Sequence, residues 1–139
     1  MAHNDVPIGA VIVDAQGEII GCGRNERELR GDPLAHAEIV ALQAAATTRG
    51  SWRFDDCTLV VTLEPCAMCA GAMSQARLAR VVFGAFDAKA GAVTSVFDVV
   101  RDPRLPHRLE VVAGIEELAC VRVLKEFFAV ARTENELPK

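Results

Sequence analysis

The segment LVVTLEPCAMCAGAMSQARLARVVFGA, residues 59–85, decides the fold of this 139-residue chain. It begins with a β-branched apolar run, Leu59 to Leu63, and ends with a second run of the same kind, Val81 to Ala85. Such short apolar runs favour buried strands. Residues 66–75 between them predict a helix, because Pro65 is suited to the first turn. Strand, helix and strand in this order predict a parallel crossover, the building unit of an α/β domain.

A hairpin and a helix are expected before this unit. Residues 8–13 form an apolar run that is too short for a helix. Residues 14–17 have turn chemistry and lead to a second run at residues 18–23, so the two runs predict a hairpin. Residues 35–48 are rich in Ala, Leu, Glu and Gln, which are good helix formers, and Gly50 follows as a stop.

The C-terminal third predicts one more strand and one more helix. Residues 109–112 alternate weakly and give a fifth strand. Residues 115–132 predict a helix, because apolar side chains recur at helical spacing at Leu118, Val121, Leu124 and Phe128. We expect Phe127 and Phe128 in the core, not on a base-stacking surface. The whole pattern predicts α/β class, a three-layer α/β/α sandwich around a mixed, about five-stranded sheet.

Composition indicates one globular domain over residues 1–139. The chain is 51% hydrophobic and has no linker, repeat or membrane-length apolar run. It also lacks a signal peptide's pattern, so the expected location is cytoplasmic, without a membrane partner. The formal net charge of -4 argues against nucleic-acid binding by overall electrostatic attraction. The densest basic stretch, which is either a local patch or a solvated turn, contains Arg101, Arg104, His107 and Arg108.

Five residues have the pattern of a metal centre. His36 and Glu38 precede Pro65, Cys66 and Cys69, and the two cysteines lie three apart, so both sulfurs face one way at the start of a helix. Three ligands would leave one tetrahedral position of a zinc ion open for water, whose pKa would fall to about 7. Residues two apart share a site only at a helix end. We therefore start the helix near residue 35, although Asp-Pro at residues 32–33 favours an earlier start.

Other interpretations of the cysteines remain open at this point. A Cys-x-x-Cys pair alone is also typical of a redox pair or of half a structural zinc knuckle. A closed structural site would need a fourth ligand from Cys57, Cys22 or His107, none of which lies at ligand spacing. We expect Cys22, Cys57 and Cys120 to be reduced, buried small apolar residues.

Four stretches of the chain resemble one known family. VPIGAVIV at 6–13, DPLAHAEI at 32–39, TLEPCAMCAGAM at 62–73 and VVFGAFDAKAGA at 81–92 resemble the bacterial tRNA-specific adenosine deaminases of the cytidine-deaminase-like superfamily. The resemblance implies hydrolytic deamination of the anticodon wobble adenosine to inosine. It also implies one zinc ion per subunit on His36, Cys66 and Cys69, with hydroxide attack at C6 and Glu38 as proton shuttle.

The resemblance also implies a substrate surface. Its residues are Asn25, Ala37, Asp87, Lys89, His107 and Arg108. Without the resemblance, Asn25 is a turn residue and the Asp87 loop an ordinary polar turn. The chain departs from the family pattern at Pro106, where asparagine is common, at Thr94, where glycine is frequent, and at Ala129 and Ala131, where basic residues are frequent. The usual N-terminal helix is absent, which predicts either a truncated start or an exposed apolar sheet face.

The implied partners are a tRNA anticodon stem-loop and a second subunit in a homodimer. Dimer symmetry would bring two small basic loops together and reconcile an acidic chain with an RNA substrate. Two alternative functions remain open for the same fold. The first is a zinc-dependent deaminase of a free base or nucleoside, such as guanine or cytosine, which has less need of Asn25, the 87–91 loop and His107-Arg108. The second is a zinc-stabilised binding module without catalysis.

Overall fold

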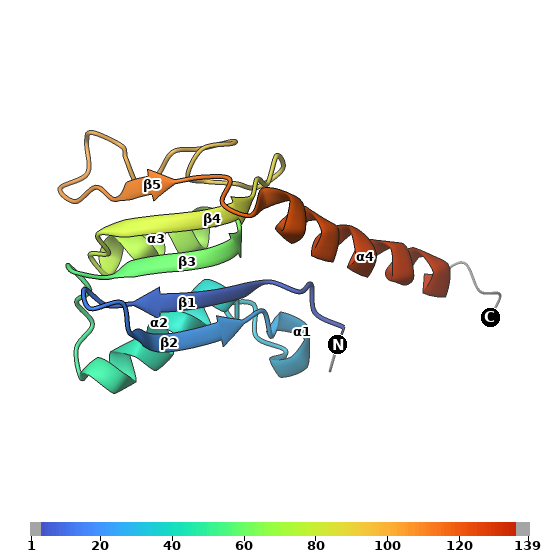
Figure 1. The fold of residues 1–139 in the computed structure, drawn as a ribbon, viewed down its shortest axis with the longest axis horizontal. Coiled ribbons are helices and arrows are strands. Elements are labelled where there is room, and N and C mark those ends of the chain that lie inside the picture. Colours follow the sequence, from blue (N-terminus) through green and yellow to red (C-terminus); the bar gives the residue numbers. More distant parts are fainter. Residues whose placement is uncertain (1–3, 136–139) are drawn as a thin grey trace.

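A computed structural model describes residues 4–135 as one mixed sheet with four helices (Figure 1). The elements are β1 (Gly9–Val13), β2 (Ile19–Arg24), α1 (Arg27–Arg30), α2 (Ala37–Arg49), β3 (Thr58–Leu63), α3 (Ala67–Gln75), β4 (Arg80–Ala85), β5 (Glu110–Val112) and α4 (Glu117–Asn135). The strand order is β2-β1-β3-β4-β5. β1 pairs antiparallel with β2 and β3, while β3, β4 and β5 run parallel. The predicted hairpin, crossover and mixed five-stranded sheet are confirmed.

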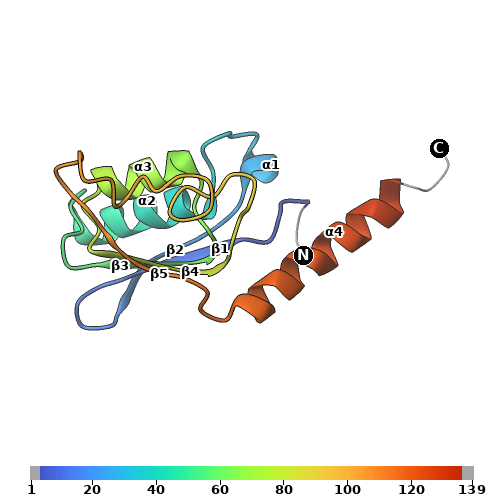
Figure 2. The same ribbon diagram turned by 90° about the horizontal axis from the view of Figure 1, so that it is seen from above.

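Two helices, α2 and α3, lie side by side on one face of the sheet (Figure 2). Two glycines of β2 let α2 lie close to the sheet. A Cβ on Gly21 would lie 2.5 Å from the carbonyl oxygen of Ala41, and a Cβ on Gly23 would lie 2.2 Å from that of Ala37. Because no other residue lacks a Cβ, these positions fix how near the start of α2 comes to the strands.

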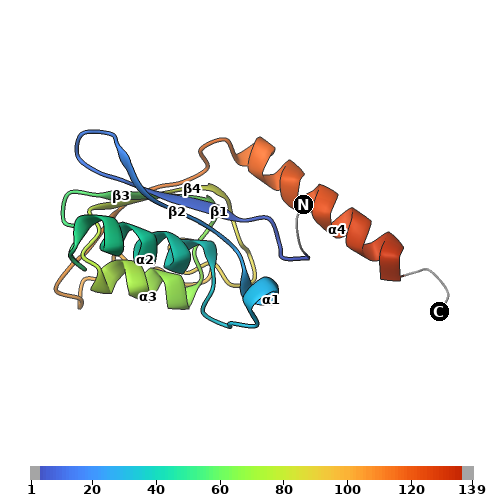
Figure 3. The ribbon, with the colours of Figure 1, turned by 90° about the horizontal axis from the view of Figure 1, so that it is seen from below.

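The opposite face is covered only in part. α4 contacts β4, begins on the side of the sheet away from α2 and α3, and then extends past the sheet (Figure 3). The rest of this face carries a shallow apolar depression lined by residues that include Val11, Val60 and Val82. An exposed apolar sheet face is one of the two outcomes that the sequence predicts. None of the helices among residues 4–135 has the length and apolarity needed to cross a membrane.

Three expectations about individual residues need correction. None of α4 is buried, and Phe128 is 48% exposed, so the prediction that Phe127 and Phe128 join the core is wrong. The reason is that α4 leaves the sheet after its first turns. Cys22 is exposed, because it lies on the uncovered face, and Cys120 is half-buried. Cys57 is fully buried as expected, and burial raises the pKa of its thiol to about 11.

Candidate metal centre and substrate cleft

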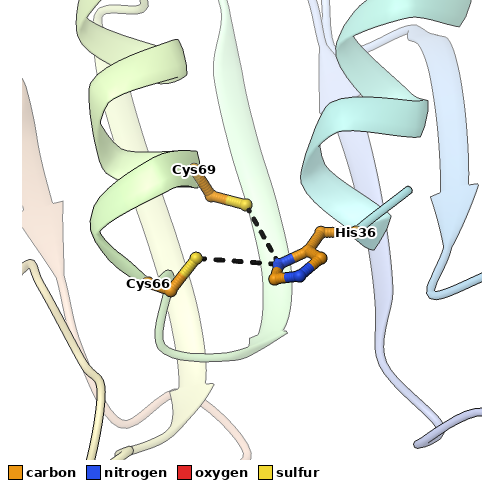
Figure 4. Close-up of side chains that lie close together, drawn as sticks. All are labelled: His36, Cys66 and Cys69. Atoms are coloured by element: carbon orange, nitrogen blue, oxygen red, sulfur yellow. Dashed lines mark hydrogen bonds between the residues drawn. The ribbon is translucent and has the colours of Figure 1, made fainter. Parts of the chain in front are cut away.

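Two helix N-termini meet beside the carboxyl end of β3. His36 and Cys66 are the residues just before α2 and α3, both with extended backbone. The Asp-Pro of residues 32–33 forms a turn instead of a helix start, since the backbone N–H of Leu34 donates to Asp32 Oδ1 at 2.9 Å. α2 therefore begins at Ala37, close to the predicted start. The side chains of His36, Cys66 and Cys69 point toward one another across the gap between the helices (Figure 4).

The donor atoms of these three side chains have the spacing of a tetrahedral zinc site. Nδ1 of His36 lies 3.6 Å from the sulfur of Cys66 and 3.6 Å from that of Cys69. Zinc bonds of about 2.3 Å to sulfur and about 2.0 Å to nitrogen, at an angle of about 109°, separate the two donors by about 3.5 Å. The residues present therefore fit a zinc ion, and Nδ1 is the imidazole nitrogen that faces it.

Residues 4–135 contain one such group of donors, and it has three members. The candidate fourth ligands Cys57, Cys22 and His107 are not part of it. A closed structural site needs four protein donors, whereas a catalytic site keeps one position for water or substrate. The described residues would therefore offer a metal ion three protein donors.

The start of α3 favours the thiolate that a metal requires. The Cys69 thiol donates a hydrogen bond to the Cys66 sulfur, and backbone N–H groups of Met68 and Cys69 add to it. Together they lower the pKa of Cys66 to about 5. The same shared proton raises the pKa of Cys69. A bound metal ion would replace this proton, because a coordinated thiol is deprotonated.

Glu38 is the acidic group at this centre. Its side chain is only 5% exposed and lines the cleft next to His36 and Cys66. Burial raises the pKa of the Glu38 carboxyl above its usual range. A carboxyl whose pKa is raised by burial, and which lines a cleft beside a candidate metal centre, is suited to accept and donate a proton.

A cleft of about 620 Å³ opens over the centre. Four residues from the predicted substrate surface, Asn25, Ala37, Asp87 and Lys89, line it. Asn25 Nδ2 donates to the Val6 carbonyl oxygen at 3.2 Å, so this side chain is anchored in the wall. The Oδ1 atom of Asp87 accepts backbone hydrogen bonds from Lys89 and Ala90, at 3.0 and 3.2 Å, which holds the turn of the opposite wall.

His107 and Arg108 are placed outside the walls of this cleft. His107 Nε2 lies 2.6 Å from the carbonyl oxygen of Leu78, in the connection between α3 and β4. A contact of His107-Arg108 with RNA stays a prediction, and it concerns a surface beyond the cleft itself.

The cleft contains residues that sequence reasoning missed. They are Val6, Ile8, Arg27, Leu63, Glu64, Phe86, Ala88, Ala90, Leu124 and Phe128. Phe86 packs edge-on against Phe83, with ring centroids 5.1 Å apart. The helical spacing of Leu124 and Phe128 marks one face of α4, but the sequence does not show that this face borders a cleft.

Comparisons with known proteins show that the chain is similar to deaminases. A family model described as MafB19-like deaminase matches residues 1–132. A tRNA-specific adenosine deaminase from Haemophilus influenzae is 44% identical over 138 residues, covering 99% of this chain and 80% of the relative. A structure from a study of A-to-I editing by tRNA:A34 deaminases has a TM-score of 0.80 and 39% identity, with 84% of each chain covered. A guanine deaminase from Nitrosomonas europaea has a TM-score of 0.72 and 25% identity, covering 88% of this chain and 72% of that one.

Proposed function

This chain belongs to the family of the tRNA-specific adenosine deaminases, and we propose that it converts adenosine to inosine, hydrolytically, at the wobble position of a tRNA anticodon. The observation that carries the proposal is the cluster of His36, Cys66 and Cys69. Two of its members, His36 and Cys66, line an open cleft together with Glu38. A closed structural metal site would need neither the cleft nor a buried acid at its edge.

His36, Cys66 and Cys69 would hold one zinc ion per subunit. When bound, the ion would supply a hydroxide nucleophile at neutral pH for attack at C6 of the adenine. Glu38 moves the protons: its carboxylate takes the proton of the water, delivers it to N1 of the adenine, and then assists the loss of ammonia. The raised pKa of this buried carboxyl is what allows it to hold that proton between the two transfers.

The remaining residues would bind and orient the nucleotide. Asn25 and Ala37 on one wall and Asp87 and Lys89 on the other face the space above the centre. The apolar side chains of Phe86 and Phe128 offer surfaces against which a flipped-out base can stack. His107 and Arg108 would contact the anticodon loop outside the cleft.

We further propose that residues 1–139 act as a single zinc-dependent deaminase domain and that the enzyme is a homodimer in the cytoplasm, where tRNA is found. A dimer would reconcile the acidic net charge with an RNA substrate, because symmetry would bring two small basic loops together. The size of the protein in solution, with and without an anticodon stem-loop, tests this part.

A second candidate is deamination of a free base, which the similarity to a guanine deaminase structure favours. One assay separates the two candidates. The zinc-loaded protein is incubated with an anticodon stem-loop that carries adenosine at the wobble position, and in parallel with free guanine, cytosine and adenosine. The proposal expects inosine in the RNA and no ammonia from the free compounds. Ammonia from guanine or cytosine, with the RNA unchanged, would instead assign the free-base reaction.

A further inference from the structure

A second buried carboxylate lies next to the metal centre, and the reaction does not use it. Glu64 follows β3 directly, precedes Pro65 and Cys66, and is 2% exposed. A buried carboxylate is costly unless hydrogen bonds satisfy its oxygens. The partners of Glu64 therefore show what the residue does.

All the hydrogen bonds recorded for the Glu64 carboxylate within residues 4–135 come from one segment, residues 87–95. The Oε1 atom accepts from the backbone N–H of Asp87 at 3.1 Å and from the hydroxyl of Ser95. Backbone N–H groups donate to Oε2 from Val93 at 3.3 Å, Thr94 at 3.0 Å and Ser95 at 2.9 Å. One side chain thus satisfies both ends of a loop that has no helix or strand of its own.

The middle of the same segment packs directly on the carboxylate. A Cβ built on Gly91 would lie 2.3 Å from Cδ and Oε2 of Glu64. The backbone N–H of Ala92 also donates to the carbonyl oxygen of Pro65 at 2.8 Å. Since Gly91 is not among the residues with positive φ, glycine is required here for space and not for backbone conformation.

This segment forms the wall of the cleft that faces α2. Asp87, Ala88, Lys89 and Ala90 all line the cleft, while Cys66, two residues after Glu64, is a metal donor. Glu64 therefore connects the start of α3 to the opposite wall through a set of hydrogen bonds that satisfies both carboxylate oxygens. Movement of this wall would change the width of the cleft without moving the three donors.

We propose that Glu64 is a positioning residue: its carboxylate fixes residues 87–95 at the distance from the metal centre that the nucleotide requires. The consequence for substrate rests on the proposed function, whereas the consequence for the order of the loop does not. Glutamine at this position would turn an amide N–H₂ group toward backbone donors and so could not accept the same bonds.

Hydrogen exchange and kinetics on the full-length, zinc-loaded protein test the proposal. In Glu64→Gln, amides of residues 87–95 should exchange about tenfold faster, while α2 and β3 keep the protection of the wild type. The KM for an anticodon stem-loop should rise about tenfold, with kcat within about threefold and zinc content unchanged. Glu110→Gln, an exposed carboxylate on β5 paired with Arg80 at 3.0 Å, is the matched control and should change none of these values.

A double-mutant cycle covers the case in which Glu64→Gln folds poorly. Gly91→Ala should loosen residues 87–95 because its Cβ displaces the carboxylate, and Ser95→Ala should do so more weakly. In a Glu64→Ala background, Gly91→Ala should add little, since the displaced group is gone. The proposal would be overturned if residues 87–95 exchange in Glu64→Gln as they do in the wild type, or if α2 exchanges faster to the same extent. It would also be overturned if the effects of Glu64→Ala and Gly91→Ala on exchange are additive. If the wild type makes no inosine, the proposed function fails, but the exchange data still decide on Glu64.

Discussion

At the scale of single residues, the metal centre depends on where one helix begins. His36 and Glu38 are two positions apart, which inside a helix would turn their side chains away from each other. Because His36 precedes α2 with extended backbone, both side chains reach the same space. The proposed proton shuttle and one proposed metal donor thus lie two residues apart at the start of α2.

Glu38→Gln tests the role of the acid. The variant should keep its zinc and its fold but lose activity by about 10²- to 10⁴-fold, because the amide cannot carry the proton. Zinc content by atomic absorption and single-turnover deamination measure the two properties separately. Cys66→Ala is the contrasting variant and should lose the metal along with activity. An active Glu38→Gln enzyme with full zinc would show that another group moves the proton.

The sequence predicts that His36, Cys66 and Cys69 lie together, because residue types and spacing carry the chemistry directly. The Pro-Cys-x-x-Cys run and the His-x-Glu pair need no knowledge of the rest of the fold. Glu64 is different: most of its donors are backbone N–H groups that lie 23 to 31 residues away, and the sequence does not mark backbone donors. The half-buried contact of His107 with the Leu78 carbonyl oxygen is unpredictable for the same reason, since a backbone acceptor is not marked in the sequence.

At the scale of elements, two glycines determine how α2 lies on the sheet. Gly23→Ala should destabilise the protein by about 1–3 kcal/mol, because its Cβ would meet the backbone of Ala37 and Ala41 within 2.5 Å. Since Ala37 follows His36, zinc affinity should fall as well. Urea unfolding and competition with a zinc chelator measure the two effects. Gly9→Ala, where an added Cβ meets nothing within 4 Å, is the control on the neighbouring strand. Equal unfolding free energies and zinc affinities in the two variants would contradict the close packing of α2 on Gly23.

An ion pair fixes the far end of α2. Arg49, the last residue of that helix, donates to both oxygens of Asp56 at 2.7 and 2.9 Å. The hydrogen bond from Arg49 lowers the pKa of Asp56 to about 2, against about 3.9 in an unfolded chain. A lowered pKa in the folded state means that the pair stabilises above about pH 4 and loses this effect as pH falls toward 2.

Asp56→Asn checks this pH dependence. Because the Asp56 side chain is 46% exposed, solvent screens the pair, and the loss at pH 7 should be at most about 1 kcal/mol. The free energy of unfolding, measured for both proteins from pH 7 to pH 2, should converge at the acid end. A difference that grows as pH falls would have the wrong sign for this pair.

The sequence gives most elements to within two or three residues, but it does not give α1. Residues 27–30 carry no apolar period, and the helix exists because Asp5 accepts backbone hydrogen bonds from Glu28 and Leu29 at 2.7 and 2.9 Å. A partner more than 20 residues away is a tertiary interaction, which local propensity does not record. The strands are predictable for the opposite reason, because their apolar runs are local.

At the scale of the whole molecule, the domain has a closed side and an open side. α2 and α3 cover one face of the sheet, while α4 borders the cleft and leaves most of the other face uncovered (Figure 1). The apolar period of α4 is sufficient to predict a helix. The period does not tell whether the apolar face lies in the core or along a cleft, since both places favour the same side chains.

The difference between a ring in the core and a ring along the cleft can be measured as a difference in stability between two alanine variants. Phe83 on β4 is fully buried, so Phe83→Ala should cost about 3–5 kcal/mol. Phe128→Ala should cost less than about 0.5 kcal/mol, because that ring is 48% exposed, and it should instead raise the KM for RNA. Thermal unfolding of the two variants gives the comparison. A large loss of stability in Phe128→Ala would show that α4 packs into the core after all.

The central claim is a metal centre with three protein donors and one open position. X-ray absorption at the zinc edge of the loaded, full-length protein tests it most directly. The spectrum should show two sulfur donors, one imidazole nitrogen and one light-atom donor from solvent, with one zinc ion bound per chain. A coordination shell with four protein donors, or a chain that binds no stoichiometric zinc, would contradict it.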